Sequence, residues 1–309
     1  MMKNANRYFI LIPLLCLFGC GNSASQFNRT NVLINKQKFE LVTTFSLFDN
    51  YLNQQNISDL TSASNNIIYE PIRNEIIDGA EAAFMFETIR IPYQPGDQLK
   101  KEVELLRSSD LLEITRKALA DITSNLPGPD TKIIFMPANP AIHDLFVKYN
   151  LCMNGVTLGG GKIIIMIDPT FPQWKKTLPM VLAHEYHHST WISRNWKDSD
   201  FTLLEYLIFE GRADAFASNL YKDVEDPWTT MINKEQEEKV WKLIKPEILL
   251  KGHDRINKVM SGDKDIPVGS GYAIGLHIVK AFKQNNPEYS DREIIDLNPE
   301  DILKLSKYE

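Results

Sequence analysis

Apolar residues recur at intervals of three and four along much of this chain, which is the spacing of amphipathic helices. In the first half, this pattern predicts helices over residues 39–52, 67–86 and 99–126, the last interrupted near Asp110. Clusters of Asn, Ser, Thr, Pro and Gly separate them. In the second half, the same spacing predicts helices over 201–221, 228–250 with a break at Pro246, 271–282 and 291–304.

Two short apolar runs have the composition of buried strands instead. Residues 132–136 follow Pro127-Gly128-Pro129, and residues 162–168 contain four isoleucines and stop at Pro169. Between them, the glycine-rich residues 154–161 predict a bend or hairpin in a sheet rather than a phosphate loop, because no Gly-Lys-Ser/Thr follows. An edge strand beside these glycines would suit an extended peptide.

The first residues have the pattern of an export signal. Lys3 and Arg7 precede an apolar run over residues 8–18, which is shorter than the roughly 20 residues of a spanning helix. The run ends in Leu17-Phe18-Gly19-Cys20, which resembles the lipobox of bacterial lipoproteins, although Phe18 is bulkier than the usual residue there. The resemblance implies acylation of Cys20 and anchoring on the extracytoplasmic side of a membrane in the bacterial cell envelope. A plain secretory signal with a chance cysteine is the alternative.

The charge and the cysteines of the chain limit its partners and its disulfide bonds. The 309 residues carry a net charge of −6, and a mildly acidic chain without basic runs argues against nucleic acid. Cys16 leaves with the signal and Cys20 would carry lipid, so Cys152 is left without a disulfide partner. We expect a signal peptide at 1–19, a tether at 20–35, a helical region at 36–126 and a second domain at 127–309.

The candidate chemistry begins with His184-Glu185-Tyr186-His187-His188. The surrounding residues predict a helix with Thr177 as its N-cap and Pro179 in its first turn. Residues four apart lie on one helical face, so His184 and His188 can bind one zinc ion, with Glu185 as general base.

Catalytic zinc takes three protein ligands and a water, so a third ligand is expected downstream. Glu210 is the candidate, and Glu205 is a rival on the same predicted helix. Asp214 follows Glu210 by one turn and can accept the outer N–H of a ligating histidine. Acidic residues on a helix are usually solvated, but the apolar neighbours of Glu210 require a metal or a salt bridge as compensation. We expect His187 to support the ligands or the fold.

His184 to His188, followed by Glu210-Gly211-Arg212-Ala213-Asp214, resembles the gluzincin arrangement and, more narrowly, the DUF2268 family of predicted zinc-dependent proteases. Residues 155–169, Gly271-Tyr272-Ala273-Ile274-Gly275 and the terminal residues 302–308 also match, so the resemblance covers about 133–308. It implies an α+β, zincin-like fold that is mostly helical, with a small sheet beside the motif helix. It also implies zinc held by His184, His188 and Glu210, with Glu185 as catalytic base in a metallopeptidase domain at 127–309.

Zinc lowers the pKa of its bound water to about 7, and Glu185 would take the proton as the hydroxide attacks a carbonyl. Tyr272 and His277 are the catalytic candidates for stabilising the oxyanion, with core packing as the alternative for each. We therefore expect a membrane-anchored zinc metallopeptidase acting on a peptide or protein. Two alternatives remain: a zinc-holding lipoprotein that does not cleave and has no need of Glu185, and a zinc hydrolase of a non-peptide amide or ester.

Overall fold

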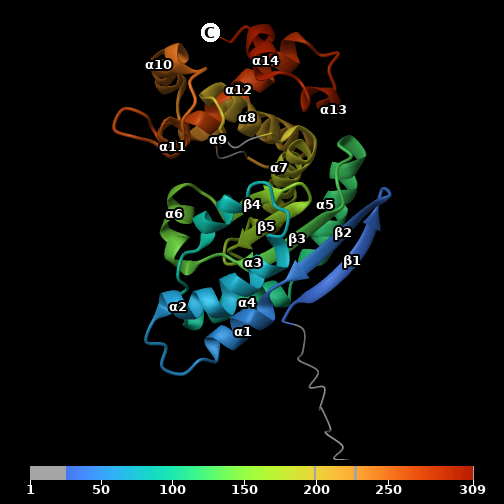
Figure 1. The fold of residues 1–309 in the computed structure, drawn as a ribbon, viewed down its shortest axis with the longest axis vertical. Coiled ribbons are helices and arrows are strands. Elements are labelled where there is room, and N and C mark those ends of the chain that lie inside the picture. The colour runs from blue at the N-terminus through green and yellow to red at the C-terminus, as the bar shows by residue number, and fades with distance from the viewer. Residues whose placement is uncertain (1–25, 198–199, 226–227, 309) are drawn as a thin grey trace, which may run out of the picture.

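The computed structural model describes residues 26–197, 200–225 and 228–308. The predicted signal peptide, Cys20 and the first part of the predicted tether lie outside these residues. Figure 1 shows a sheet in the middle of the molecule, with the amino-terminal helices at one end and the carboxyl-terminal helices at the other. The predicted class, α+β and mostly helical with a small sheet beside the motif helix, is confirmed.

The sheet has five strands in the order β1-β2-β3-β5-β4. The central strands β2, β3 and β5 are parallel, whereas β1 and β4 are antiparallel edge strands. The strands predicted at 132–136 and 162–168 are confirmed as β3 and β5, and the isoleucines of both are buried. The bounds are β1 (Asn28–Ile34), β2 (Gln37–Thr43), β3 (Thr131–Pro137), β4 (Met153–Gly159) and β5 (Lys162–Ile167).

The hairpin β1–β2 corrects two predictions. Residues 28–34, expected in the tether, form a strand, and residues 39–43, expected at the start of a helix, belong to β2. Phe39 and Leu41 are buried and alternate with polar residues, which is the period of a strand, and β2 pairs with β3. Asn35 and Lys36 form the two-residue turn, both at positive φ as such hairpins require.

Short helices join this hairpin to β3, and they are more interrupted than their apolar spacing predicted. The helix predicted over 67–86 is broken around Gly79, which has a positive φ. The elements are α1 (Phe45–Leu52), α2 (Leu60–Ser64), the π-helix η1 (Asn65–Tyr69), α3 (Glu70–Ile76), the 3-10 helix η2 (Ala83–Ile89), α4 (Asp97–Arg107) and α5 (Leu111–Asn125).

The predicted glycine hairpin is confirmed between β4 and β5. Gly161 has a φ of +77°, and a Cβ at this position would lie 2.2 Å from the carbonyl oxygen of Asp130. Its N–H donates to Ser189 Oγ at 2.7 Å, which ties the hairpin to the motif helix. Before β4, the chain forms η3 (Pro140–Ile142) and α6 (His143–Lys148).

The motif helix α7 (Trp174–Asn195) packs on β4 and β5, and α5 packs against it. The predicted start is wrong: α7 begins at Trp174, so Thr177 lies in its first turn and Pro179 lies inside the helix. Tyr186 donates its hydroxyl to Gln37 Oε1 at 2.7 Å, which fastens α7 to β2.

The carboxyl-terminal helices gather around α8 (Leu203–Leu220), which packs on both α7 and α12 (Ser270–Asn285). Two glycines allow α8 and α12 to approach: a Cβ on Gly211 would lie 2.1 Å from the carbonyl oxygen of Gly275. The other elements are α9 (Trp228–Met231), α10 (Lys234–Ile244), η4 (Lys245–Glu247), α11 (His253–Ser261), α13 (Asp291–Ile294) and α14 (Pro299–Ser306).

The buried apolar residues form two clusters. One surrounds the sheet and reaches from β1 to α7, and the other fills the space between α8, α10, α11, α12 and α14. The boundary expected at residue 127 therefore crosses the first cluster and one continuous sheet. Among the described residues, no helix has both the length and the apolar character needed to cross a bilayer.

Candidate metal centre

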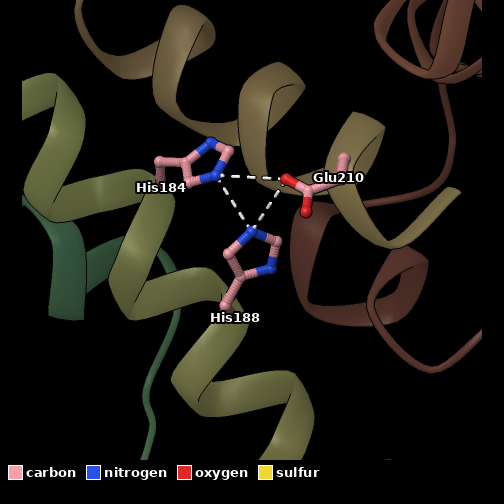
Figure 2. Close-up of side chains that lie close together, drawn as sticks. All are labelled: His184, His188 and Glu210. Atoms are coloured by element: carbon pink, nitrogen blue, oxygen red, sulfur yellow. Dashed lines mark hydrogen bonds and ion pairs between the residues drawn. The ribbon is translucent and has the colours of Figure 1, made fainter. Parts of the chain in front are cut away.

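The helix α7 turns His184 and His188 toward each other across one helical turn. Their Nε2 atoms lie 2.9 Å apart and their rings are nearly perpendicular, at 88°. Figure 2 shows both imidazoles facing the carboxylate of Glu210. Glu210 Oε2 lies 3.2 Å from His188 Nε2 and 3.5 Å from His184 Nε2. The three residues expected as ligands thus converge from two helices.

The helix α8 places Glu210 because its start is fixed by a capping box. Thr202 Oγ1 accepts from the Glu205 N–H at 3.1 Å, and Glu205 Oε2 accepts from the Thr202 N–H at 2.7 Å. Glu205, the rival third ligand, is therefore occupied at the helix end. The close contact between Gly211 and Gly275 then fixes the depth at which Glu210 enters the site.

The donor set fits a zinc ion. Two imidazole nitrogens and one carboxylate oxygen are the combination of ligands that catalytic zinc sites use. A tetrahedral site with bonds of about 2.0–2.1 Å has ligand–ligand separations of roughly 3.3 Å. The observed separations of 2.9, 3.2 and 3.5 Å lie around that value. Of all His, Cys, Asp and Glu residues that the structure describes, only these three form a cluster with metal-binding geometry.

Asp214 orients His184. Its Oδ1 lies 2.7 Å from His184 Nδ1, so the carboxylate accepts the Nδ1–H and leaves Nε2 free to bind a cation. Burial opposes charge on His184, but Asp214 and Glu210 outweigh that cost and raise the pKa of His184 well above its ordinary value. Burial likewise opposes ionisation of Glu210, but His188 and His184 hold the pKa of its carboxyl well below the usual range. The cluster thus keeps anionic and cationic groups together in a buried site.

On the side of the ring away from Glu210, His188 is held by aromatic packing and not by a second carboxylate. Its ring stacks on Phe209 with centroids 4.0 Å apart, and its Nδ1 is buried without a hydrogen-bond partner in the part of the chain that the structure describes. His187 points elsewhere, because its ring packs against Phe216 with centroids 5.7 Å apart. Burial lowers the pKa of His187 well below its ordinary value, so this residue is a neutral packing group behind the cluster.

Two residues of β4 position Glu185. Thr157 Oγ1 lies 2.7 Å from Glu185 Oε2 and 2.9 Å from the Glu185 main-chain oxygen, and its single proton can serve either acceptor. Gly155 leaves the room that the carboxylate occupies, since a Cβ there would lie 2.4 Å from Glu185 Oε1. The sequence did not reveal either contact. The glycine-rich composition of the strand was the one available signal.

The structure separates the two residues expected to stabilise an oxyanion. Tyr272 lines the cleft with Glu185 and Glu210. His277 does not: its Nδ1 lies 2.8 Å from Glu237 Oε1, and Tyr308 donates to the same carboxylate. Five residues along a helix correspond to about 140° of rotation, so α12 cannot turn both side chains to one site. The expectation for His277 is therefore corrected to a structural contact between α10 and α12.

Burial, followed by the charge of Glu210, raises the pKa of Tyr272 well above its ordinary value. Tyr206, which is not among the predicted site residues, also lines the cleft, one helical turn before Glu210 on α8. Burial and the nearby Glu210 carboxylate raise the pKa of Tyr206 as well. Its spacing of four from Glu210 was the signal that could have identified it.

These groups open into a cleft of about 790 Å³. It contains His184, Glu185, His188, Glu210 and Tyr272 together with much apolar surface. Part of the lining comes from Phe84 and Met85 of η2, in the amino-terminal region. The cleft is thus shared between the two regions that were predicted separately at 36–126 and 127–309.

A comparison with protein families agrees with this site. A family model described as a predicted Zn-dependent protease (DUF2268) matches residues 111–304. No curated protein matches the chain. Among solved structures, an aminopeptidase N family protein from Idiomarina loihiensis is similar at 10% sequence identity with a TM-score of 0.41. That similarity covers 91% of this chain and 40% of the other, so the present chain spans less than half of that protein.

The family match extends over more than half of the chain and includes the motif helix, Glu210 and Asp214. The chain therefore belongs to the DUF2268 family of predicted zinc-dependent proteases.

Proposed function

We propose that this protein is a zinc metallopeptidase that hydrolyses peptide bonds in the cleft beside α7. The observation that carries the proposal is the convergence of His184, His188 and Glu210, with Glu185 beside them in the same cleft. Bound by these three residues, zinc would supply Lewis-acid polarisation of a substrate carbonyl and would acidify water.

The side chains of the chain itself divide the remaining work. Glu185 accepts the proton of the attacking water and then delivers it to the leaving amine. Thr157 holds the Glu185 carboxylate in place through the 2.7 Å contact with Oε2. Asp214 keeps His184 in the tautomer that presents Nε2. Tyr272 stays protonated because of its raised pKa, so its hydroxyl can donate to the developing oxyanion.

The same observations weigh against a protein that only holds zinc. Gly155 and Thr157 are arranged around the Glu185 carboxylate, and a silent zinc site has no need of an oriented base. The test is removal and restoration of the metal. Chelation should abolish cleavage of a peptide library by the full chain, and one equivalent of Zn²⁺ should restore it. Cleavage that persists at full rate after chelation would refute the proposal.

We further propose that the enzyme is anchored through Cys20 on the extracytoplasmic face of a bacterial membrane. The support is the sequence Leu17-Phe18-Gly19-Cys20 after a short apolar run. Dual acylation gives stable anchoring, whereas one chain alone is marginal. Labelled palmitate should enter the wild-type chain and be absent from Cys20→Ser; equal labelling of both would contradict the anchor.

A further inference from the structure

The cleft is long because it follows α7. Its lining extends from Gln173, the residue before α7, to Trp196, the residue after it. At about 1.5 Å per residue, this stretch measures roughly 34 Å. An extended polypeptide at about 3.3 Å per residue would cover it with about ten residues. His184 and His188 lie inside the stretch, so the cleft continues on both sides of the metal cluster.

On the amino-terminal side of the motif, the lining is aliphatic and aromatic. We call this surface the amino-side wall; it comes from η2, α6 and the first half of α7 and consists of Phe84, Met85, Leu145, Phe146, Met180 and Val181. Phe84 is 50% exposed and Leu145 is 53% exposed. Large apolar side chains that stay half exposed gain little from folding, and an apolar ligand that covers them is stabilised by the area removed from water.

On the carboxyl-terminal side of the motif, the lining is mostly aromatic. We call this surface the aromatic wall; it consists of Ile192, Trp196, Phe201, Tyr206 and Phe209. Phe201 contacts the rings of Trp196, Tyr206 and Phe209 with centroids 5.8 to 6.0 Å apart. Phe209 in turn stacks on His188, so the aromatic wall begins at the metal cluster itself.

Charge is scarce along this lining. Apart from the metal cluster, Glu185 and Asp214, the charged residues among the described ones that line the cleft are Lys176 and Glu225. Any charged substrate side chain on either wall would lose water and gain at most one counter-charge. The cleft therefore discriminates against charged segments on both sides of the motif.

The edge strand β4 supplies hydrogen-bonding groups for a main chain. Asn154, Gly155, Val156 and Thr157 line the cleft, and β4 is an edge of the sheet. Ala82 N–H donates to Leu158 O at 2.9 Å, so the edge is paired at Leu158, whereas none of the described residues outside the sheet makes a main-chain hydrogen bond to residues 154–157. A lipid has no use for such an edge, whereas an extended peptide can pair with it.

We propose that the substrate is an extended polypeptide segment with large apolar side chains on both sides of the scissile bond, bound along α7 between the amino-side wall and the aromatic wall. This inference rests on the proposed peptidase function and names its substrate class. Because the cleft continues on both sides of the metal cluster, the cut bond lies inside the bound segment. The amino-side wall depends on η2, which lies outside the family match, so the amino-terminal region takes part in substrate selection.

The direct test compares three decapeptides on the full chain in detergent with Zn²⁺ added. One carries Leu and Phe around its central bond, and in the other two these residues are replaced by Glu or by Lys. The apolar peptide should be cleaved with a kcat/KM at least tenfold higher than either charged one. Equal rates would overturn the substrate class while leaving the peptidase function intact.

A matched pair of variants locates the effect. Leu145 and Val147 both lie on α6 and are 53% and 58% exposed, but Leu145 lines the cleft and Val147 is outside its lining. Leu145→Ser should lower kcat/KM for the apolar peptide about tenfold, whereas Val147→Ser should leave it unchanged. Equal effects of the two substitutions would contradict the amino-side wall.

Binding separates this inference from the proposed function. A fluorescent apolar decapeptide should bind Glu185→Ala at least tenfold more tightly than its Lys counterpart, as measured by anisotropy. Selective binding of the apolar peptide without cleavage by the wild type would contradict the peptidase function but would support the proposed binding surface. Binding of phospholipid vesicles in competition with the peptide would show that the cleft holds acyl chains instead and would overturn the inference.

Discussion

Glu210 and Glu102 are both buried carboxylates, and their surroundings are opposite. Glu210, on α8, faces His184 and His188, and the pKa of its carboxyl is held well below the usual range. Glu102, on α4, receives one contact of 3.2 Å from the Gln98 amide, and its Oε2 has no hydrogen-bond partner among the described residues. Burial, assisted by the nearby Asp168, raises the pKa of Glu102 to about 8.

The difference shows why burial alone does not mark a functional site. A carboxylate stays ionised in the interior only when positive or hydrogen-bonding groups are fixed around it; otherwise it becomes neutral. Glu102 becomes neutral and serves as a packing group. Glu210 stays ionised, and the groups around it are those that zinc requires.

The largest effect on catalysis is expected when a buried glutamate in each of the two regions is replaced by glutamine. Glu185→Gln removes the base beside Glu210 and should lower kcat at least about 10³-fold in a quenched-peptide assay, while the bound zinc is retained. Glu102→Gln should cleave at the wild-type rate. Comparable losses in the two variants would show that the assay reports folding, and wild-type activity in Glu185→Gln would remove the base from the mechanism.

The pH dependence of the free energy of unfolding should respond to the substitution at Glu102 instead. Because the folded-state pKa of Glu102, about 8, lies above the ordinary value of 4.5, its protonated form is favoured by folding, and wild-type stability falls as pH rises from about 5 to 8. Glu102→Gln should remove this fall and be more stable by about 4 kcal/mol at pH 8, with a difference below about 1 kcal/mol at pH 5. Parallel urea midpoints for both proteins across this pH range would contradict the buried, unpaired state of Glu102.

Asp214→Asn tests the support of the metal cluster. Loss of the charged acceptor on His184 Nδ1 should weaken zinc binding about 10- to 100-fold, as measured by competition with a chelating dye. Glu237→Gln is the matched control, since Glu237 contacts His277 in the same manner at 2.8 Å but away from the cleft. An equal change of zinc affinity in both variants would show that Asp214 does not orient His184.

The smallest effect is expected from the hydroxyl that holds Glu185. Thr157→Val should lower kcat about tenfold with KM and zinc content unchanged, and Thr157→Ser should restore the rate because it keeps the donor.

Gly155→Ala tests the position of Glu185 through thermal stability instead of activity. It should lower Tm when Glu185 is present and cost much less in the Glu185→Ala background, where the clash is relieved.

The parts of the site that the sequence predicted depend on helical periodicity. His184, His188, Glu210 and Asp214 are related by spacings of four within two helices, so local geometry alone determines which of them share a face. Helical spacing did not predict that the two helices would converge. That prediction came from the rule that catalytic zinc takes three protein ligands.

The parts that were missed depend on contacts between distant residues. The residues of β2 pair with β3 more than ninety positions later, at Phe39 and Thr131 for instance, so their strand conformation was not evident from local spacing. Thr157 reaches Glu185 across 28 residues, and His277 is drawn to Glu237 by α10. In each case tertiary packing decided between conformations or orientations that the local pattern allowed.

The zinc content of matched variants tests the central claim most directly. Elemental analysis of the purified full chain should find close to one zinc per molecule in the wild type and in Glu102→Gln. His184→Ala and Glu210→Ala should each contain almost none, because two ligands do not retain the ion at this site. Full zinc occupancy in both His184→Ala and Glu210→Ala would contradict the metal centre and, with it, the proposed function.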